Sequence, residues 1–172
     1  CGSGSTEAYT VRLRENLLPF LKKYQITSIL DAPCGDYHWM NMVQFPNDLQ
    51  YIGADIVDNL IEKNKSTYPG VDFRVLDISI DKLPAVDLLF CRDCLFHFNV
   101  DDVFQTLNNF VKSDIKYLLT SHYPDYSNSS INTGEFHPIN LTKDPFKLPT
   151  PIDYIEDWIE GYPIRHTSLW EL

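Results

Sequence analysis

Short apolar runs alternate with amphipathic stretches along the whole chain, and few folds accommodate such a pattern. Apolar runs bounded by turn-forming residues have the length and composition of buried strands over 28–31, 51–55, 72–77, 86–91 and 116–121. The stretches between them repeat apolar residues at helical spacing, which predicts helices over 8–24, 37–43, 57–68 and 101–111. Apolar strands that alternate with helices form a parallel sheet covered on both faces.

The end of the chain follows a different pattern. After Tyr123 the sequence is polar and interrupted by prolines, and it finishes with strand-like runs over 152–158 and 167–172, expected to pair antiparallel at the sheet edge. The sequence therefore predicts a single-domain, Rossmann-like, doubly wound α/β fold: a mostly parallel seven-stranded sheet with an antiparallel last strand. Its 172 residues suit one domain. We expect that domain over 6–172, whereas 1–5 resemble a linker or a scar from an expression vector.

The balance of charges excludes one class of partners. Aspartate and glutamate number 24 against 14 lysines and arginines, a net charge of −10, and no cationic cluster exists beyond Lys22 and Lys23. A protein that binds DNA or RNA needs such clusters to neutralise phosphates, so we expect no nucleic-acid partner. No apolar run approaches the roughly 20 residues of a membrane span. The cysteines after Cys1 are odd in number, which favours a reducing cytoplasm over a disulfide framework.

Acidic residues close the predicted strands. Asp31, Asp55 and Asp77 end three of them, and Asp93 follows the next. In doubly wound sheets the ligand lies in the crevice at the carboxyl ends of the strands. A single acid at such a position usually caps the next helix, but three acids directed at one crevice indicate a ligand site.

The turn after the first strand narrows the choice of ligand. Asp55 lies about 20 residues beyond that turn, the spacing at which an acid binds ribose hydroxyls in dinucleotide folds. The turn itself, Asp-Ala-Pro-Cys-Gly-Asp-Tyr over 31–37, lacks the glycines that let the backbone approach a pyrophosphate, and Asp36 would repel one. These features predict a cofactor with ribose and adenine but without phosphates.

The same turn resembles the first motif of the class I S-adenosylmethionine-dependent methyltransferases, in which a strand ends in an acid and runs into a glycine-containing turn. Asp31, Cys34 and Gly35 match that motif, whereas Pro33 and Tyr37 stand at two of its glycine positions. The resemblance extends over 24–123 and implies S-adenosyl-L-methionine as the cofactor. The residues implied to bind it are Asp31, Ala32, Pro33, Gly35, Asp55, Ile56, Asp77, Ile78 and Arg92.

The resemblance implies a role for each of the three acids that end a predicted strand. The motif implies that Asp31 addresses the amino end of the methionine moiety, beside the backbone of Ala32 and Gly35. Asp55 matches the acid that binds both ribose hydroxyls. Asp77 matches the acid that recognises the adenine amino group.

Four residues are candidates for the chemistry at this crevice: Asp93, His97, His122 and His137. Methyl transfer needs donor and acceptor aligned and shielded from water, and a hydroxyl acceptor gains from a general base. Asp93 and His97 are four residues apart, which in a helix puts them on one face. A structural role, such as satisfying a buried backbone group, is an equal alternative for His97 and His122.

The long segment after the fifth predicted strand is a candidate for binding the methyl acceptor. Segments of this length without regular structure are usually functional or disordered. Its mixture of acidic, amide, imidazole and aromatic groups suits a polar ligand such as a sugar, and a plain surface loop is the competing interpretation. The residues expected to contact the acceptor are Glu135, Phe136, His137 and Tyr123.

A narrower resemblance bears on the substrate. The pattern D-A-P-C-G-D-aromatic-x-W-M, followed by C-R-D-C-L-F-H, is similar to a bacterial subfamily often associated with gene clusters for cell-surface polysaccharides. It implies a cytoplasmic enzyme that methylates a hydroxyl of a sugar or sugar-linked metabolite. Two alternatives stay open: a methyltransferase-like binding or interaction module without turnover, and methyl transfer to a phosphate-type, amine or protein acceptor.

We expect no metal site. Cys91 and Cys94 form one C-x-x-C pair without the second pair that a structural zinc site needs. Asp93 and the histidines near it offer too few carboxylates for a divalent cation that prefers oxygen ligands.

Overall fold

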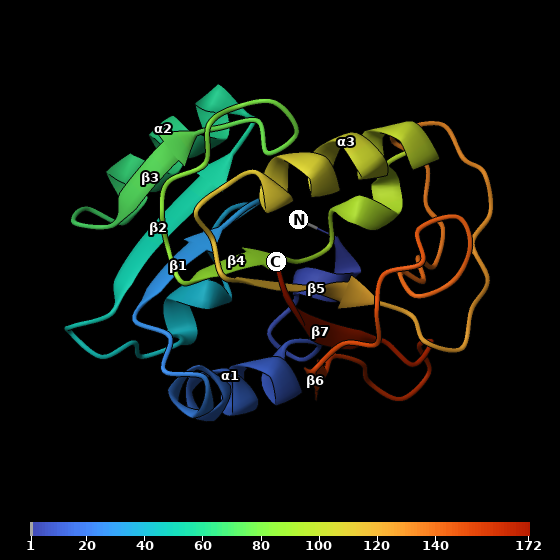
Figure 1. The fold of residues 1–172 in the computed structure, drawn as a ribbon. Coiled ribbons are helices and arrows are strands. Elements are labelled where there is room, and N and C mark those ends of the chain that lie inside the picture. The colour runs from blue at the N-terminus through green and yellow to red at the C-terminus, as the bar shows by residue number, and fades with distance from the viewer. Residues whose placement is uncertain (1) are drawn as a thin grey trace.

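The computed structural model of the chain describes residues 2–172, and its centre is a seven-stranded sheet (Figure 1). The strand order is β3-β2-β1-β4-β5-β7-β6. Strands β1 to β5 run parallel, and β7 pairs antiparallel with β5 and β6, which confirms the predicted fold class. The strands are β1 (Ser28–Asp31), β2 (Gln50–Asp55), β3 (Asp72–Val75), β4 (Leu88–Cys91), β5 (Tyr117–His122), β6 (Asp153–Glu156) and β7 (His166–Glu171).

Helices cover both faces of the sheet. α1 (Val11–Lys23) and α2 (Asp58–Thr67) contribute to the apolar cluster on one face. α3 (Val100–Val111) packs on the other face, and Figure 1 shows α1 and α3 on opposite sides of the sheet. Among residues 2–172, no helix has the length and apolar character needed to cross a membrane.

Helix α3 illustrates how the sequence produces these elements. Asn99 precedes it, and its side chain accepts a hydrogen bond from the backbone N–H of Asp102 at 2.9 Å. That bond satisfies one of the N–H groups that the start of a helix leaves without an intrahelical partner. Val103, Leu107 and Phe110 recur at helical spacing and are buried against the sheet.

The prediction of a helix over 37–43 is wrong, because this segment contains a single 3-10 turn, η2 (Met40–Met42). Tyr37 has a φ of +58°, in the left-handed region that interrupts a right-handed helix. Its buried ring packs against those of Tyr51 and Tyr68, with centroids 5.3 and 5.1 Å away. Tertiary packing therefore overrides the local helical pattern, and it holds Tyr37 in the core.

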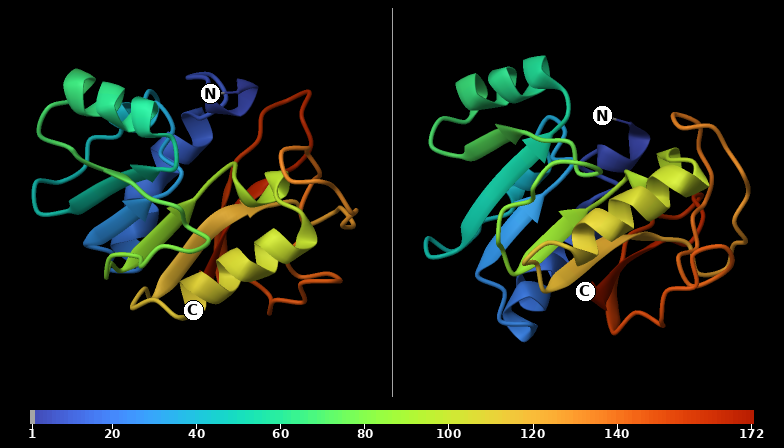
Figure 2. Two further views of the ribbon diagram at one scale, coloured as in Figure 1. Left: turned by 90° about the horizontal axis from the view of Figure 1, so that it is seen from above. Right: turned by 45° about the horizontal axis from the view of Figure 1, so that its top comes forward.

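The switch point of the sheet lies at β1. This strand has β2 on one side and β4 on the other, so the direction in which the strands are added reverses there. Ligands of doubly wound sheets bind outside such a point. In both views of Figure 2 the dark blue N-terminal segment lies between α2 and the orange and red loops that follow β5.

The long segment between β5 and β6 is attached to the short turn η3 (Leu95–His97) that follows β4. The N–H of Gly134 donates to the carbonyl of His97 at 2.7 Å, and the N–H of His137 donates to the carbonyl of Phe96 at 3.1 Å. These backbone bonds fix the segment beside the carboxyl end of β4.

Candidate active site

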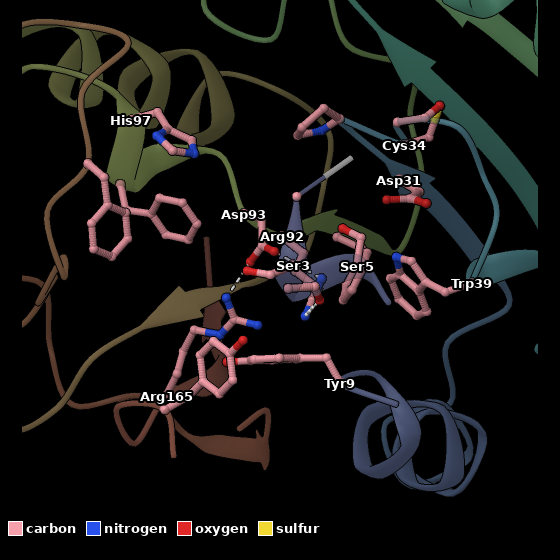
Figure 3. Close-up of a pocket in the computed structure, with 18 of the residues that line it drawn as sticks. Ser3, Ser5, Tyr9, Asp31, Cys34, Trp39, Arg92, Asp93, His97 and Arg165 are labelled. Atoms are coloured by element: carbon pink, nitrogen blue, oxygen red, sulfur yellow. Dashed lines mark hydrogen bonds and ion pairs between the residues drawn. The ribbon is translucent and has the colours of Figure 1, made fainter. Parts of the chain in front are cut away.

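A cavity of about 550 Å³ opens at the carboxyl ends of the central strands (Figure 3). Its size is within the range of pockets that bind small molecules and cofactors. Its walls come from the turns after β1, β2 and β4, the N-terminal segment, the segment after β5 and the loop before β7. It is lined by Gly2, Ser3, Gly4, Ser5, Tyr9, Asp31, Pro33, Cys34, Gly35, Trp39, Asp55, Phe90, Arg92, Asp93, Phe96, His97, Tyr123, Phe136, Tyr162, Pro163 and Arg165.

The turn after β1 is fixed by its own backbone hydrogen bonds. The N–H groups of Ala32 and Cys34 donate to carbonyl oxygens of β4 and β2, at 2.9 and 2.7 Å. The N–H of Gly35 donates to Asp55 Oδ2 at 3.2 Å, and its φ of +56° is a conformation that glycine adopts without strain. Pro33 has no N–H. No backbone donor between positions 32 and 35 is therefore free to meet a ligand.

Asp31 ends β1 and is buried, with one carboxylate oxygen lacking a partner. Oδ2 accepts a hydrogen bond from the Tyr51 hydroxyl, whereas no donor within residues 2–172 reaches Oδ1. Burial raises the pKa of Asp31 to about 7, against the opposing effects of the Tyr51 hydrogen bond and the Arg92 charge. Because a buried acceptor without a donor is costly, a cationic group in the cavity would stabilise this carboxylate.

Asp55 ends β2 and is oriented by two backbone donors. Its Oδ2 accepts from the N–H of Gly35 at 3.2 Å, and its Oδ1 accepts from the N–H of Val57 at 3.0 Å. Each oxygen keeps a further lone pair. The fixed carboxylate can therefore accept hydrogen bonds from two neighbouring hydroxyls, as ribose binding requires.

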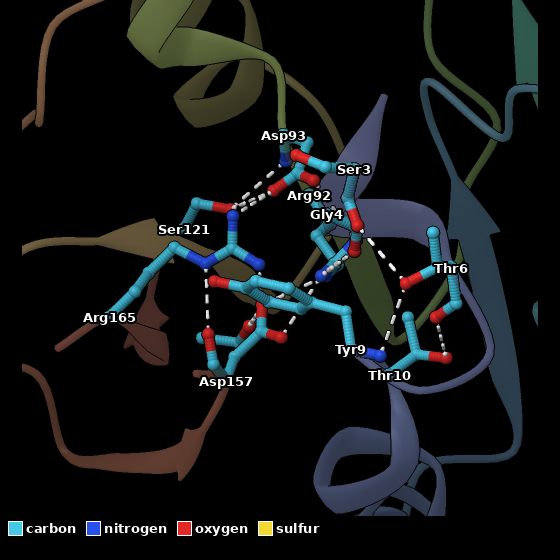
Figure 4. Close-up of polar contacts among 11 residues, drawn as sticks. Ser3, Gly4, Thr6, Tyr9, Thr10, Arg92, Asp93, Ser121, Asp157 and Arg165 are labelled. Atoms are coloured by element: carbon cyan, nitrogen blue, oxygen red, sulfur yellow. Dashed lines mark hydrogen bonds and ion pairs between the residues drawn. The ribbon is translucent and has the colours of Figure 1, made fainter. Parts of the chain in front are cut away.

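Two arginines and two aspartates form a buried ion-pair network beside the cavity (Figure 4). Asp157 is fully buried and pairs with Arg92 and Arg165, each at 2.8 Å. Asp93 pairs with the same two arginines at 3.1 and 2.6 Å. Although burial alone would raise it, the charges of Arg92 and Arg165 hold the pKa of Asp157 below its usual value. The four charges thus neutralise one another within the protein.

The network engages all three guanidinium nitrogens of each arginine. Arg92 is 4 % exposed and directs its guanidinium N–H groups at Asp157, Asp93 and the carbonyl of Gly4. Arg165 is 3 % exposed and directs its N–H groups at Asp93 and Asp157. Arg92 therefore lines the cavity, and the charges of both guanidinium groups are paired with Asp93 and Asp157.

Asp93 is held by more bonds than its arginine partners provide. Its N–H donates to Ser121 Oγ at 3.0 Å, and the Ser121 hydroxyl donates back to Oδ1 at 3.3 Å. Its φ of +55° lies in the left-handed region, which is uncommon for residues other than glycine. With both carboxylate oxygens in ion pairs, Asp93 is suited to orienting the wall of the cavity rather than to accepting a proton.

His97 presents a free ring nitrogen. Its Nδ1 lies 2.9 Å from the carbonyl oxygen of Glu135. Because a carbonyl oxygen can accept but not donate, Nδ1 carries the hydrogen, and Nε2 of the neutral ring keeps its lone pair. Figure 3 shows His97 across the cavity from Asp31. Among the four predicted candidates for a general base, His97 lines the cavity and keeps a ring nitrogen without a partner in the described chain.

Aromatic rings surround the part of the cavity near His97. The Phe136 ring is 55 % exposed, and its centroid lies 5.2 Å from that of Phe96 and 6.3 Å from that of Tyr123. Tyr9 and Tyr162 form a second edge-to-face pair at 5.2 Å. Such rings offer faces onto which a ring-shaped ligand can pack.

The structure brings together many of the predicted site residues, but not all of them. Those that line the cavity are Asp31, Pro33, Gly35, Asp55, Arg92, Asp93, His97, Tyr123 and Phe136. Those that do not are Ala32, Ile56, Asp77, Ile78, His122, Glu135 and His137. Ala32 and Ile78 are buried in the core, and Ile56 is 62 % exposed. Asp77 accepts a hydrogen bond from the N–H of Ser79 at 2.9 Å within its own turn.

His122 and His137 are buried outside the cavity, so their positions support no catalytic role. His122 Nδ1 accepts from the N–H of Leu141 at 3.3 Å, and its ring packs edge-on against Trp170 at 5.5 Å. Burial lowers the pKa of His122 to about 4, and burial also lowers the pKa of His137. Both imidazoles are therefore neutral parts of the core at physiological pH.

Several lining residues are missed by reasoning from the sequence. Glycine and serine are typical of linkers, yet Ser3–Ser5 form a 3-10 turn, η1, in the cavity wall, while Cys1 lies outside the described residues. For Arg165 the sequence offers one signal, because this cation directly precedes β7 while the opposite charge of Asp157 directly follows β6. The pairing of Asp157 with Arg92 cannot be predicted from the sequence, because the two residues lie 65 positions apart.

The cysteines within residues 2–172, Cys34, Cys91 and Cys94, are free and buried. Burial raises the pKa of the Cys34 thiol, which keeps it protonated. In this part of the chain no group of three or more histidine, cysteine or acidic side chains is arranged to hold a metal ion.

Comparison with known proteins agrees with this architecture. No protein-family model matches the chain. Over 154 residues the chain is 32 % identical to "Putative methyltransferase 235L" of Invertebrate iridescent virus 6, a match that covers 80 % of this chain and 54 % of the viral protein. The chain thus spans about half the length of this curated relative.

Solved methyltransferase structures share the fold at low sequence identity. An S-adenosylmethionine-dependent methyltransferase from Clostridium acetobutylicum superposes with a TM-score of 0.66 at 13 % identity, covering 94 % of this chain and 91 % of that one. Magnesium protoporphyrin IX methyltransferase from Synechocystis PCC 6803, solved with bound SAM, gives 0.65 at 11 % identity, covering 95 % and 80 %. The chain therefore has the fold of these methyltransferases.

Proposed function

We propose that the chain is an S-adenosyl-L-methionine-dependent methyltransferase that acts on a hydroxyl of a sugar or sugar-linked metabolite. The observation that carries the proposal is a pair of carboxylates, Asp31 and Asp55, at the ends of adjacent parallel strands and lining one cavity. The viral relative and the methyltransferases that share the fold support the same reaction class.

The residues of the cavity fit this cofactor. Asp31 offers a buried acceptor without a donor, which suits a cationic ligand, and Asp55 offers two oriented oxygens for ribose hydroxyls. Between positions 32 and 35 the turn after β1 has no free N–H group for a pyrophosphate, in keeping with a cofactor that lacks phosphates. When bound, S-adenosylmethionine supplies a methyl group already activated on a positively charged sulfur.

The task left to the protein is to align the acceptor and take up its proton. The hydrogen bond from His97 Nδ1 to the Glu135 carbonyl orients Nε2 as the atom that removes the proton of an acceptor hydroxyl. The Phe96 and Phe136 rings have centroids 4.6 and 6.2 Å from that of the imidazole, so apolar surface lies beside His97. The proton then leaves the imidazolium for solvent.

The charge of the cavity favours a neutral acceptor. Arg92 and Arg165 are both committed to Asp93 and Asp157, so neither can pair with a phosphate or carboxylate group. Exposed aromatic faces such as that of Phe136 suit a sugar ring. Together with the resemblance to a subfamily from polysaccharide gene clusters, these features favour a surface-polysaccharide sugar as the acceptor.

Calorimetry with S-adenosylhomocysteine tests the cofactor assignment. We expect micromolar binding to the wild type and a loss of about 10- to 100-fold in Asp55→Asn, because an acceptor of two hydroxyl hydrogen bonds is weakened. The matched control is Asp72→Asn, an exposed aspartate at the start of β3, which should bind as the wild type does. No binding to the intact wild-type protein would exclude the proposal.

Turnover is tested separately, with S-adenosylmethionine and a panel of nucleotide sugars and surface glycans analysed by mass spectrometry. We expect one sugar to gain the mass of a single methyl group. If only amines or phosphate esters were methylated, the acceptor would belong to one of those classes and the proposed sugar acceptor would be wrong. Cofactor binding without turnover on any acceptor would favour the binding-module alternative.

A further inference from the structure

The N-terminal turn η1 (Ser3–Ser5) is built into the cavity wall. The carbonyl of Gly4 accepts a hydrogen bond from Arg92 Nη2 at 2.7 Å, and Arg92 is in turn held by Asp157. Position 4 has no room for a side chain, because a Cβ atom there would lie 2.8 Å from Asp93 Oδ2. Glycine thus allows the backbone of η1 to contact the ion-pair network directly.

The other end of η1 is tied to the residues that lead into α1 (Figure 4). The Thr6 hydroxyl donates to the carbonyl of Ser3 at 3.2 Å and accepts from the N–H of Tyr9 at 3.3 Å. The Thr10 hydroxyl donates to the carbonyl of Thr6 at 3.0 Å. These contacts position η1 from both sides.

The hydroxyls of Ser3 and Ser5 are available for a ligand. Both residues line the cavity, and Figure 3 shows them between Asp93 and Asp31. Among the described residues, neither hydroxyl has a hydrogen-bond partner, although the backbone of the same turn is bonded to Thr6 and Arg92.

The neighbouring parts of the wall offer few other donors. The N–H groups of the turn after β1 donate within the protein, and Pro33 has none. All three guanidinium nitrogens of Arg92, and all three of Arg165, donate to groups of the protein. The hydroxyls of Ser3 and Ser5 are donors in this part of the wall, beside the indole N–H of Trp39.

We propose that η1 completes the cofactor site by binding the carboxylate of the methionine moiety through Ser3 and Ser5. This inference rests on the proposed function, because it takes S-adenosylmethionine as the ligand. The unpartnered oxygen of Asp31 suits the ammonium group of the same moiety, so its two charges meet groups of opposite polarity. Neutral donors leave the cavity acidic, which suits a ligand with a net positive charge.

Two ligands that differ by a single carboxylate test the proposal: S-adenosylmethionine and decarboxylated S-adenosylmethionine, each titrated by calorimetry. We expect the Ser3→Ala/Ser5→Ala double variant to lose about 10- to 100-fold in affinity for the former. The same variant should bind the decarboxylated ligand as the wild type does. The matched control is Ser129→Ala/Ser130→Ala, two exposed serines outside the cavity, which should bind both ligands normally.

Each other outcome has a distinct meaning. Equal losses for both ligands, or no loss for either, overturn the assignment of the carboxylate to η1, provided that the melting temperature is unchanged. Normal binding of both ligands with a raised KM for the acceptor would put η1 in the acceptor site and overturn it as well. Failure of the wild type to bind either ligand contradicts the proposed function itself.

Discussion

The hydrogen bond between His97 Nδ1 and the Glu135 carbonyl leaves Nε2 with a free lone pair, and the proposed function makes this nitrogen the general base. His97→Gln keeps a polar side chain but removes the basic nitrogen, so we expect kcat to fall by about 10²- to 10⁴-fold with cofactor binding unchanged. Steady-state kinetics at saturating S-adenosylmethionine measure kcat, and calorimetry measures the affinity for the cofactor; a variant with the wild-type kcat contradicts the assignment.

In the proposed cofactor site, we expect Asp31 to make cofactor binding depend on pH. Because burial raises its pKa to about 7, the unliganded carboxyl holds a proton in mild acid. A cationic ligand favours the carboxylate, so binding of S-adenosylmethionine should release that proton and tighten as the pH rises through about 7. Calorimetry in buffers of different ionisation enthalpy counts the released proton. Asp31→Asn should bind more weakly and without this pH dependence; a wild-type affinity that is flat across the same range argues against the linkage.

Single residues differ in how far the sequence predicts their place. Asp31 and Asp55 are predicted correctly because the end of an apolar run marks the end of a parallel strand, and such ends share one edge of the sheet. His122 also ends a strand, but the alternation of side chains directs Ser121 toward Asp93 and His122 toward Trp170. The sequence of β5 alone does not show which of its residues face the cavity and which face the core, because this depends on how β5 is placed against β7.

Among the elements, the ends of β4, β6 and β7 are joined through Asp157. Asp157→Asn would leave two buried guanidinium groups sharing Asp93, so we expect a loss of about 3–5 kcal/mol in the free energy of unfolding. Urea denaturation measures it. Asp153→Asn on β6 is the control, because its pair with the exposed Lys23 should contribute about 0–1 kcal/mol. Similar losses in the two variants would show that the network stabilises the fold no more than a surface ion pair does.

The start of α3 provides a smaller test. Asn99→Ala removes the side-chain acceptor for the N–H of Asp102, so we expect a loss of about 1 kcal/mol in the free energy of unfolding. Asn108→Ala, at an exposed position inside the same helix, should cause no loss, because alanine has the higher helix propensity. Urea denaturation measures both losses. A greater loss in Asn108→Ala than in Asn99→Ala would contradict a stabilising role of the Asn99 side chain at the start of the helix.

The elements themselves are largely predictable, since apolar periodicity reflects which residues face the core. The helix expected over 37–43 is the exception, because the contacts that hold Tyr37 come from β2 and from beyond α2. The turn η1 is not predictable for a different reason: glycine and serine are equally suited to a flexible linker and to a tight turn. What distinguishes the two is the hydrogen bond from Arg92, 88 positions away.

At the scale of the whole molecule, two buried groups link stability to pH in opposite directions. His122, with a pKa lowered to about 4 by burial, binds its proton more tightly when unfolded, so the free energy of unfolding rises with pH between about 4 and 6.5. Asp31, with a pKa of about 7, binds its proton more tightly when folded, so the free energy of unfolding falls between about 4 and 7. Each contributes up to about 1.4 kcal/mol per pH unit, and the two largely cancel.

Single substitutions should separate the two contributions. In His122→Asn, which keeps an acceptor for the N–H of Leu141, the free energy of unfolding should fall as the pH rises from about 4 to 7. In Asp31→Asn it should rise from about 4 to 6.5. Urea titrations at intervals across this range measure both slopes, and slopes of the same sign in the two variants would contradict the assignment.

The ion-pair network also sets an order of events during folding. Arg92 meets Gly4 across 88 positions and Asp157 across 65, so its partners come from opposite ends of the chain. During synthesis the central strands emerge with Arg92 still lacking its principal counter-charge, and contacts this distant in sequence form slowly because long loops must close first. The cavity can therefore mature only once β6 and β7 have docked, which makes the binding site one of the last features of the fold to form.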